Sequence, residues 1–133
     1  MMYPNITRSY AECKLALAYA DDAFAPLPAF LVKHVGAAGM SLAHGKIKAK
    51  YGIDDERASL LERLALWEDE LQGRDFRGGA KPDLADVAVY GVLNAVAGLP
   101  ARDDVVAASP AVGAWLDRVD AALPLPIVVE NDA

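Results

Sequence analysis

The stretch that decides the fold covers residues 76–87 and reads FRGGAKPDLADV. It has the form of a helix start. Asp83 can accept hydrogen bonds from the backbone N–H groups of the first turn. Asp86, three residues later, can accept one from the N–H of Asp83, which makes a carboxylate version of the capping box. Pro82 and Val87 stand where a hydrophobic staple would pack. We therefore predict a capped helix after Asp83 and a structural, not catalytic, role for the two carboxylates.

The helix that follows this cap is predicted to run from Leu84 to about Gly98, and it is apolar on nearly every face. A helix without a polar face is surrounded by other elements, so we expect it to be the central helix of the fold. Because no water reaches the N–H groups at the start of a buried helix, its cap matters more than a surface cap. Losing such a cap typically costs about 0.5–2 kcal/mol.

Four further helices are predicted around the central one, and no strands. Their signals are capping residues at the start, glycine or proline at the end, and apolar residues at three- and four-residue steps. The stripes are Leu60, Leu64, Trp67 and Leu71 in one helix and Val112, Leu116, Val119 and Leu123 in another. The predicted helices are 8–22 with Thr7 or Ser9 as cap, 28–51 ended by Gly52, 55–72 opened by Asp54 and Asp55, and 109–123 opened by Ser109 and Pro110.

The predicted fold is therefore all-α, a bundle of five helices, or six if residues 100–108 or the tail add a short one. We expect a single domain over residues 1–133, with an ordered core of about 3–123 and a loose tail over 124–133. A bare surface at Gly36, Ala37, Ala38 and Gly39 would let a neighbouring helix approach closely.

Composition restricts the function classes. The chain has 133 residues, 54% of them hydrophobic and 24% charged, which is typical of one folded domain. A net charge of −6 would repel phosphate backbones, so nucleic-acid binding is not expected. The apolar stretches 31–43 and 84–101 are too short or too interrupted for a membrane span of about 20 residues. The first seven residues lack the pattern of a secretory signal or a transit peptide.

Side chains that could carry chemistry have structural explanations. Cys13 is the single cysteine, and we predict that it is a buried or half-buried small apolar residue. His34 and His44 lie ten residues apart on one helix with no further Cys or His at ligand spacing, so no metal site is predicted. The acidic pairs 21–22, 54–55 and 103–104 fall at helix ends or in loops, where capping accounts for them.

Two groups of residues keep alternative interpretations. Lys46, Lys48 and Lys50 complement the negative end of their helix and are explained by a solvated face. The alternative is a docking patch for an acidic partner. The aromatic residues are predicted to belong to the core, and the alternative is a platform for a ligand; they are Trp67, Trp115 and Tyr90.

The cap at Asp83 and Asp86 resembles the N-capping box and staple that open the central helix in the C-terminal domain of glutathione transferases. The wider sequence is similar to the prostaglandin E synthase type 2-like branch of that superfamily, and more to its plant and algal members than to its animal ones. The resemblance covers about residues 3–123. The matching strings are Tyr3-Pro4-Asn5-Ile6, Gly36-Ala37-Ala38-Gly39-Met40, Tyr51-Gly52-Ile53, Asp55-Glu56-Arg57-Ala58-Ser59-Leu60, Gly73-Arg74, Gly78-Gly79, Lys81-Pro82, Leu84-Ala85-Asp86 and Ala88-Val89-Tyr90-Gly91-Val92-Leu93, with Trp115 and Arg118 in the place of the closing helix.

The resemblance implies a fold and, through what this sequence lacks, a function. In that branch a thioredoxin-like N-terminal half carries a Cys-x-x-Cys pair and most of the glutathione site, and the present chain contains neither. Cys13, beside Glu12 and Lys14, lies mid-helix, not at the helix N-terminus that favours a thiolate. No catalytic residue of the family is carried over, and we predict no autonomous catalysis and no cofactor.

The function expected from this resemblance is a non-catalytic interaction or accessory module, a subunit of a larger assembly. Its protein partner would cover the surface that relatives pack against their thioredoxin-like half. The alternative is the C-terminal part of a glutathione-dependent isomerase or transferase, where this domain forms the wall of a hydrophobic substrate pocket. Glutathione would bind only in the presence of a thioredoxin-like domain. The plant-like character favours a plastid or mitochondrion, with the cytoplasm as the alternative, and association with a membrane complex stays open.

Overall fold

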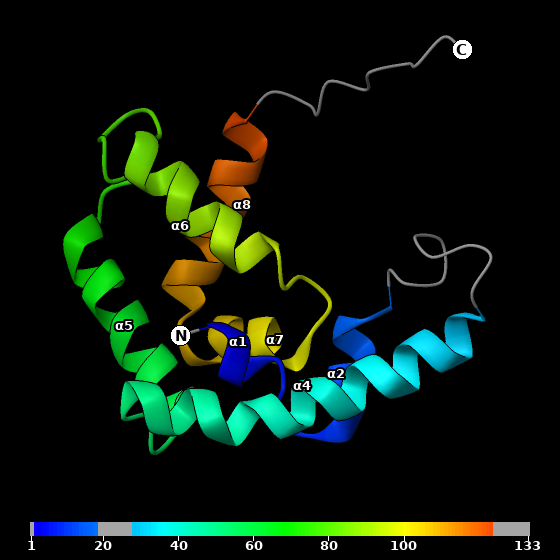
Figure 1. Cartoon of the computed structure of the whole chain (residues 1–133). Helices are drawn as coiled ribbons and strands as arrows, with labels where there is room; N and C mark the ends of the chain where they lie inside the picture. The colour runs from blue at the N-terminus through cyan, green and yellow to red at the C-terminus, as the bar shows by residue number, and fades with distance from the viewer. Residues whose placement is uncertain (1, 19–27, 124–133) are drawn as a thin grey trace, which may run out of the picture.

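The computed structural model describes residues 2–18 and 28–123, and its described part is built from helices (Figure 1). This confirms the predicted all-α class. Within these residues the only β feature is an isolated bridge between Phe76 and Gly79. The helices are α1 (Met2–Asn5), α2 (Tyr10–Ala16), α4 (Ala29–Tyr51), α5 (Glu56–Leu71), α6 (Leu84–Asn94), α7 (Pro100–Ala108) and α8 (Pro110–Ala122). Five correspond to the predicted helices, α7 is the short helix allowed for residues 100–108, and α1 is a single turn that the sequence analysis does not assign.

The N-terminal helices follow their predicted caps. The Ser9 hydroxyl accepts a hydrogen bond from the N–H of Glu12, which starts α2 at Tyr10. This helix ends at Ala16, earlier than predicted, and the expected end at residue 22 lies outside the described residues. At the far end of α4, Gly52 takes the left-handed conformation with φ of 62°, which stops the helix where the sequence indicates.

Helix α2 packs against α4. The contact uses half of the bare surface predicted at residues 36–39. A Cβ atom on Gly36 would lie 2.7 Å from Cδ1 of Leu17, and Ala37 is fully buried. Ala38 and Gly39, in contrast, are exposed. The close approach of the two elements therefore explains Gly36, but it leaves the next two small residues without a role in the fold.

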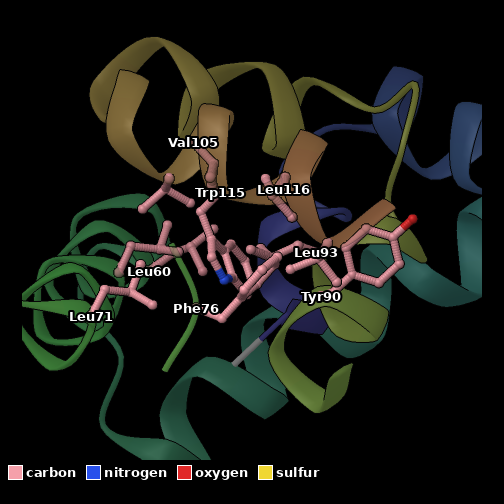
Figure 2. Packing of buried hydrophobic residues seen from close by; sticks show 11 residues of the cluster. Leu60, Leu71, Phe76, Tyr90, Leu93, Val105, Trp115 and Leu116 are labelled. Atoms are coloured by element: carbon pink, nitrogen blue, oxygen red, sulfur yellow. The ribbon is translucent and has the colours of Figure 1, made fainter. Parts of the chain in front are cut away.

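Helices α5 and α8 carry the predicted apolar stripes into the core. Asp55 caps α5 by accepting from the N–H groups of Arg57 and Ala58, each at 2.9 Å. Ser109 caps α8 by accepting from the N–H of Val112 at 3.1 Å. Figure 2 shows Trp115 in the middle of the packed cluster, with Leu60 on one side and Leu93 on the other. The buried cluster is Leu60, Leu64, Leu71, Phe76, Tyr90, Leu93, Val105, Val112, Trp115, Leu116 and Val119.

The central helix is α8, and the prediction that the helix after Asp83 is surrounded is wrong. Among the described elements α8 packs against α5, α6 and α7, whereas the main neighbour of α6 is α8. Leu84 is 84% exposed and Val92 is 53% exposed. Helix α6 also ends at Asn94, and turns follow to Gly98. The apolar sequence of α6 favours burial. It does not determine how many neighbouring helices pack around α6 in the folded chain.

We compared the described helices with the requirements for a membrane-spanning helix. None of those in residues 2–18 and 28–123 combines the length and the apolar character that a bilayer crossing requires.

Candidate functional site

The loop before α6 and the start of that helix are organised around Asp86. The capping box expected from the sequence is present, with Asp83 Oδ1 accepting from the N–H groups of Ala85 and Asp86 at 2.8 and 3.0 Å. Asp86 Oδ2 accepts from the N–H of Asp83 at 2.9 Å.

Asp86 has further partners beyond the box. Its side chain also accepts from the backbone N–H groups of Arg77 at 3.0 Å and Gly78 at 3.3 Å. The indole Nε1–H of Trp115 donates to Asp86 Oδ1 at 3.0 Å. A carboxylate offers about four acceptor sites, so this fully buried group is saturated by four donors from three segments. It ties the loop, α6 and α8 together and has no acceptor site left for a substrate.

The tight loop around Asp86 explains the glycine pair that precedes it. A Cβ atom on Gly78 would lie 2.6 Å from the carbonyl oxygen of Lys81, and Gly79 has φ of 93°. Arg77 closes the outside of the loop by donating to Glu70 Oε1 at 3.2 Å and to Asp83 Oδ2 at 2.7 Å. The pKa of Asp83 is lowered, first by the backbone N–H of Asp86 and then by Arg77. The pair is therefore a turn device, as predicted.

An apolar groove lies between α5 and α6 and has a volume of about 590 Å³. Leu66 and Val92 on its edges are 59% and 53% exposed. Its charged lining residues are Arg63 and Glu70, seven residues apart on α5. The whole lining is Met2, Leu60, Arg63, Leu64, Leu66, Trp67, Glu70, Ala88, Val89, Val92 and Leu93. The arrangement suits an apolar occupant with a polar outer edge.

Trp67 connects this groove to the core. Its ring meets that of Trp115 edge-on, with centroids 5.2 Å apart and an interplanar angle of 66°. Its buried Nε1–H has no hydrogen-bond partner in the described part of the chain. Trp115 and Tyr90 are core residues, as predicted, with 0% and 8% exposure. Trp67 is half-buried and belongs to both the core and the groove.

The three lysines proposed as a docking patch do not form one free face. Lys48 Nζ binds Glu56 Oε2 at 2.5 Å, inside the joint between α4 and α5. Lys50 Nζ lies 5.3 Å from the centroid of the Tyr51 ring. Lys46 is exposed. Residues two apart on a helix point in nearly opposite directions, so the alternating lysines cannot present three ammonium groups to one partner.

The side chains that could be reactive, one cysteine and two histidines, are buried or have hydrogen-bond partners within the fold. Cys13 is fully buried as predicted, and burial first, then the charge of Glu12, raises the pKa of its thiol. His34 Nδ1 lies 2.6 Å from the Tyr10 hydroxyl, and His44 Nδ1 lies 2.9 Å from the Thr7 hydroxyl. Among residues 2–18 and 28–123 no three His, Cys, Asp or Glu side chains are grouped as metal ligands would be.

One member of each described acidic pair has a local partner. Asp55 caps α5, and Asp104 Oδ2 lies 3.1 Å from Nε of Arg57. The pair at residues 21–22 lies outside the described residues. None of the described pairs brings two carboxylates into the groove.

Sequence reasoning missed the groove, although a signal for it exists. Leu66 is apolar but stands off the predicted stripe of α5, and α6 is apolar on nearly every face. Both helices have more apolar surface than a contact between them can bury. This excess predicts an uncovered apolar surface between them. Which flanks remain open depends on the tertiary arrangement, which the sequence pattern does not contain.

Comparison with known proteins agrees with this architecture. Residues 50–118 match the family described as glutathione S-transferase, C-terminal domain. Prostaglandin E synthase 2 of Mus musculus is 36% identical over 127 residues, covering 92% of this chain and 33% of the relative. Prostaglandin E synthase 2 of Danio rerio is 30% identical over 126 residues, again covering 92% of this chain and 33% of the relative. The chain thus spans about a third of the length of these curated relatives.

Proposed function

The chain belongs to the glutathione S-transferase C-terminal domain family, and from this premise we propose that it is a non-catalytic interaction module of a larger assembly. The observation that carries the proposal is the apolar groove between α5 and α6, with Leu66 and Val92 exposed on its edges. Large uncovered apolar patches on soluble proteins mark interaction sites. We infer that a protein partner covers this groove.

The groove has the features of a surface that receives a helix. Amphipathic helices bind by laying their apolar face into a groove of this kind. Arg63 on α5 offers a positive charge to the polar flank of such a helix, whereas Glu70, two turns later, is already paired with Arg77. Beyond the groove, Leu84 extends the exposed apolar surface along α6. The partner expected here is therefore an amphipathic protein segment with an acidic residue beside its apolar face.

The chemistry of the described side chains supports a non-catalytic role. The buried carboxylate of Asp86 is saturated by four donors, and Cys13 is buried with a raised thiol pKa. General acid–base catalysis needs a titratable group within reach of a substrate. Among the described residues that line the groove, Glu70 alone has a carboxylate, and Arg77 already binds it. This supports binding over catalysis.

A second candidate function is favoured by the size of the groove. Pockets for small molecules have volumes of about 300–1,000 Å³ and mostly apolar walls, and the groove of about 590 Å³ lies in that range. The domain would then form the wall of a hydrophobic substrate pocket in a glutathione-dependent isomerase or transferase. Glutathione itself would bind through a thioredoxin-like domain. The two relatives named prostaglandin E synthase 2 are the reason to test an isomerase.

The test is the native size of the endogenous protein in gently lysed source cells, by size exclusion with immunodetection. A tagged wild-type copy should elute in a large assembly. A Val92→Glu copy should not enter it, because the substitution places a charge in the groove. Ala107→Glu, at an exposed position on α7, is the matched control and should enter normally.

The opposite result has a clear meaning. Elution at the size of a simple two-domain enzyme, with glutathione-dependent turnover that Val92→Glu abolishes, would overturn the accessory role and favour the second candidate.

A further inference from the structure

Another pocket lies between α2 and the start of α4, apart from the groove described above. Figure 1 shows α2 alongside the N-terminal half of α4. The pocket has a volume of about 530 Å³, within the range of about 300–1,000 Å³ that is usual for small-molecule sites. Its described lining residues are Ala11, Lys14, Leu15, Ala18, Phe30, Lys33 and His34. We call this site the α2–α4 pocket, and it shares none of these residues with the groove.

The lining residues occupy one face of each helix. On α2 and the turn after it they stand three, one and three positions apart, and on α4 they stand three and one apart. Residues three or four apart share one side of a helix, so each helix turns a single face toward the pocket. The close contact of Leu17 with Gly36 holds the two helices together near this site.

The ionisable side chains of the pocket are basic. Among the described residues, Lys14, Lys33 and His34 line it, and no Asp or Glu does so. The whole chain has a net charge of −6, so its average composition does not account for this lining. Positive charge in a hollow with apolar walls attracts anions. The pocket therefore favours an anion that has an apolar body.

His34 is oriented by Tyr10 so that it can donate to such an anion. The Tyr10 hydroxyl lies 2.6 Å from His34 Nδ1 and 3.5 Å from the His34 carbonyl oxygen. The shorter contact makes Nδ1 the acceptor of the hydroxyl proton, which leaves the imidazole proton on Nε2. Lys14 Nζ lies 5.4 Å from the centroid of the same Tyr10 ring, so a positive charge stands close by.

Apolar side chains on both helices form the walls of the pocket. Phe30 is 72% exposed, and its ring centroid lies 4.2 Å from that of His34. Leu15, on the other helix, is 50% exposed. Exposed apolar surface of this kind leaves water when a ligand fills the pocket. The aromatic ring of Phe30 favours a second aromatic ring beside it.

We propose that the α2–α4 pocket binds an aromatic carboxylate. The ring of the ligand lies between Phe30 and Leu15. Its carboxylate accepts from the ammonium group of Lys14 and from the Nε2–H of His34, and charge-assisted hydrogen bonds of this kind fix the orientation of a ligand. Because it shares no residue with the groove, this site does not depend on the proposed function.

The first experiment is a titration of the full ¹⁵N-labelled chain with 2-naphthoate, followed by NMR. The ligand should shift the amide signals of residues 11–18 and 30–34, with a Kd below about 1 mM for a ligand of this size. The indole signals of Trp67 and Trp115 should stay in place, because neither residue lines the pocket. Binding in the groove would instead shift the signal of Trp67.

The second experiment tests the charge. 2-Naphthamide has the same rings without the charge and should shift the same amides about fivefold less at equal concentration below saturation. Lys14→Gln should weaken naphthoate about fivefold and leave naphthamide unchanged, which separates loss of the charge from loss of the pocket. Lys46→Gln, at an exposed lysine near the other end of α4, is the matched control and should bind naphthoate as wild type does. Circular dichroism verifies that both variants fold.

Three outcomes would overturn the proposal. Naphthoate could shift no amide in residues 11–18 and 30–34, it could bind no more tightly than naphthamide, or it could keep its affinity in Lys14→Gln. Decanoate is the aliphatic comparison. If decanoate binds the pocket more tightly than naphthoate does, the aromatic class assigned to the ligand is wrong.

Discussion

At the scale of single residues, the buried carboxylate of Asp86 holds together more segments of the structure than any other polar side chain described. It accepts from the N–H groups of Arg77, Gly78 and Asp83 and from the indole of Trp115. Leaving a buried donor without a partner costs about 1–3 kcal/mol. The carboxylate therefore acts as the common acceptor for a loop, a helix start and the central helix.

Replacing Asp86 by alanine should lower the free energy of unfolding by about 3 kcal/mol, since several buried donors lose their acceptor at once. Asp83→Ser is the matched control. Serine keeps an oxygen at the N-cap, and the lost ion pair with Arg77 is exposed, so the loss should stay below about 1 kcal/mol. Urea unfolding followed by far-UV circular dichroism measures both. Equal losses in the two variants would contradict the role assigned to Asp86.

At the scale of elements, the joint between α4 and α5 is closed by Glu56. This residue is 8% exposed, and its carboxylate binds Lys48 at 2.5 Å and Arg8 at 3.2 Å. Its backbone carbonyl accepts from Asn5 Nδ2 at 2.8 Å. Burial alone would raise the pKa of Glu56. The hydrogen bond and charge of Lys48, with further help from the backbone and His44, outweigh burial and leave the pKa lowered.

The lowered pKa predicts how stability depends on pH. Because the pKa of Glu56 is lower in the folded chain than in the unfolded one, its contribution is fully present above the ordinary value of 4.5. That contribution is lost as the pH falls through the folded value. Glu56→Gln should therefore flatten the loss of stability below about pH 4.5. Glu62→Gln, an exposed neighbour on α5, should leave the acid limb as in wild type. Thermal unfolding from pH 3 to pH 7 provides the comparison, and identical acid limbs in all three chains would exclude this role for Glu56.

The elements also show which parts of the structure a sequence can predict. Ser9, Asp55, Asp83 and Ser109 cap helices as predicted, because a cap depends on residues within one turn of it. The outcome for α6 was different, since its burial depends on how many elements pack around it. The sequence of α4 alone also cannot predict which of its lysines are free. The ammonium group of Lys48 binds the carboxylate of Glu56 on the next helix.

At the scale of the whole molecule, the described chain exposes two apolar surfaces on different elements. One is the groove between α5 and α6, and the other is the exposed face of α4 with Leu31, Val35 and Leu42. Leu60, Leu64 and Leu93 of the core line the groove, whereas the exposed face of α4 lies apart from the core. A partner segment in the groove would therefore contact the core directly.

The two tryptophans allow occupancy of the groove to be measured without labels. Trp67 lines the groove, whereas Trp115 is fully buried. In Trp115→Phe only Trp67 emits, and acrylamide should quench its fluorescence several-fold more than that of Trp115 in Trp67→Phe. Decanol, an apolar probe that fits the groove, should protect Trp67 from the quencher because apolar surface leaves water when the groove is filled.

The matched variant makes this measurement specific. In Trp67→Phe the remaining Trp115 should respond to neither acrylamide nor decanol, provided that circular dichroism shows the same helix content in both variants. Quenching of Trp67 that decanol leaves unchanged would mean that the groove does not accept an apolar occupant. Because both candidate functions place an apolar partner or substrate there, that result would argue against both.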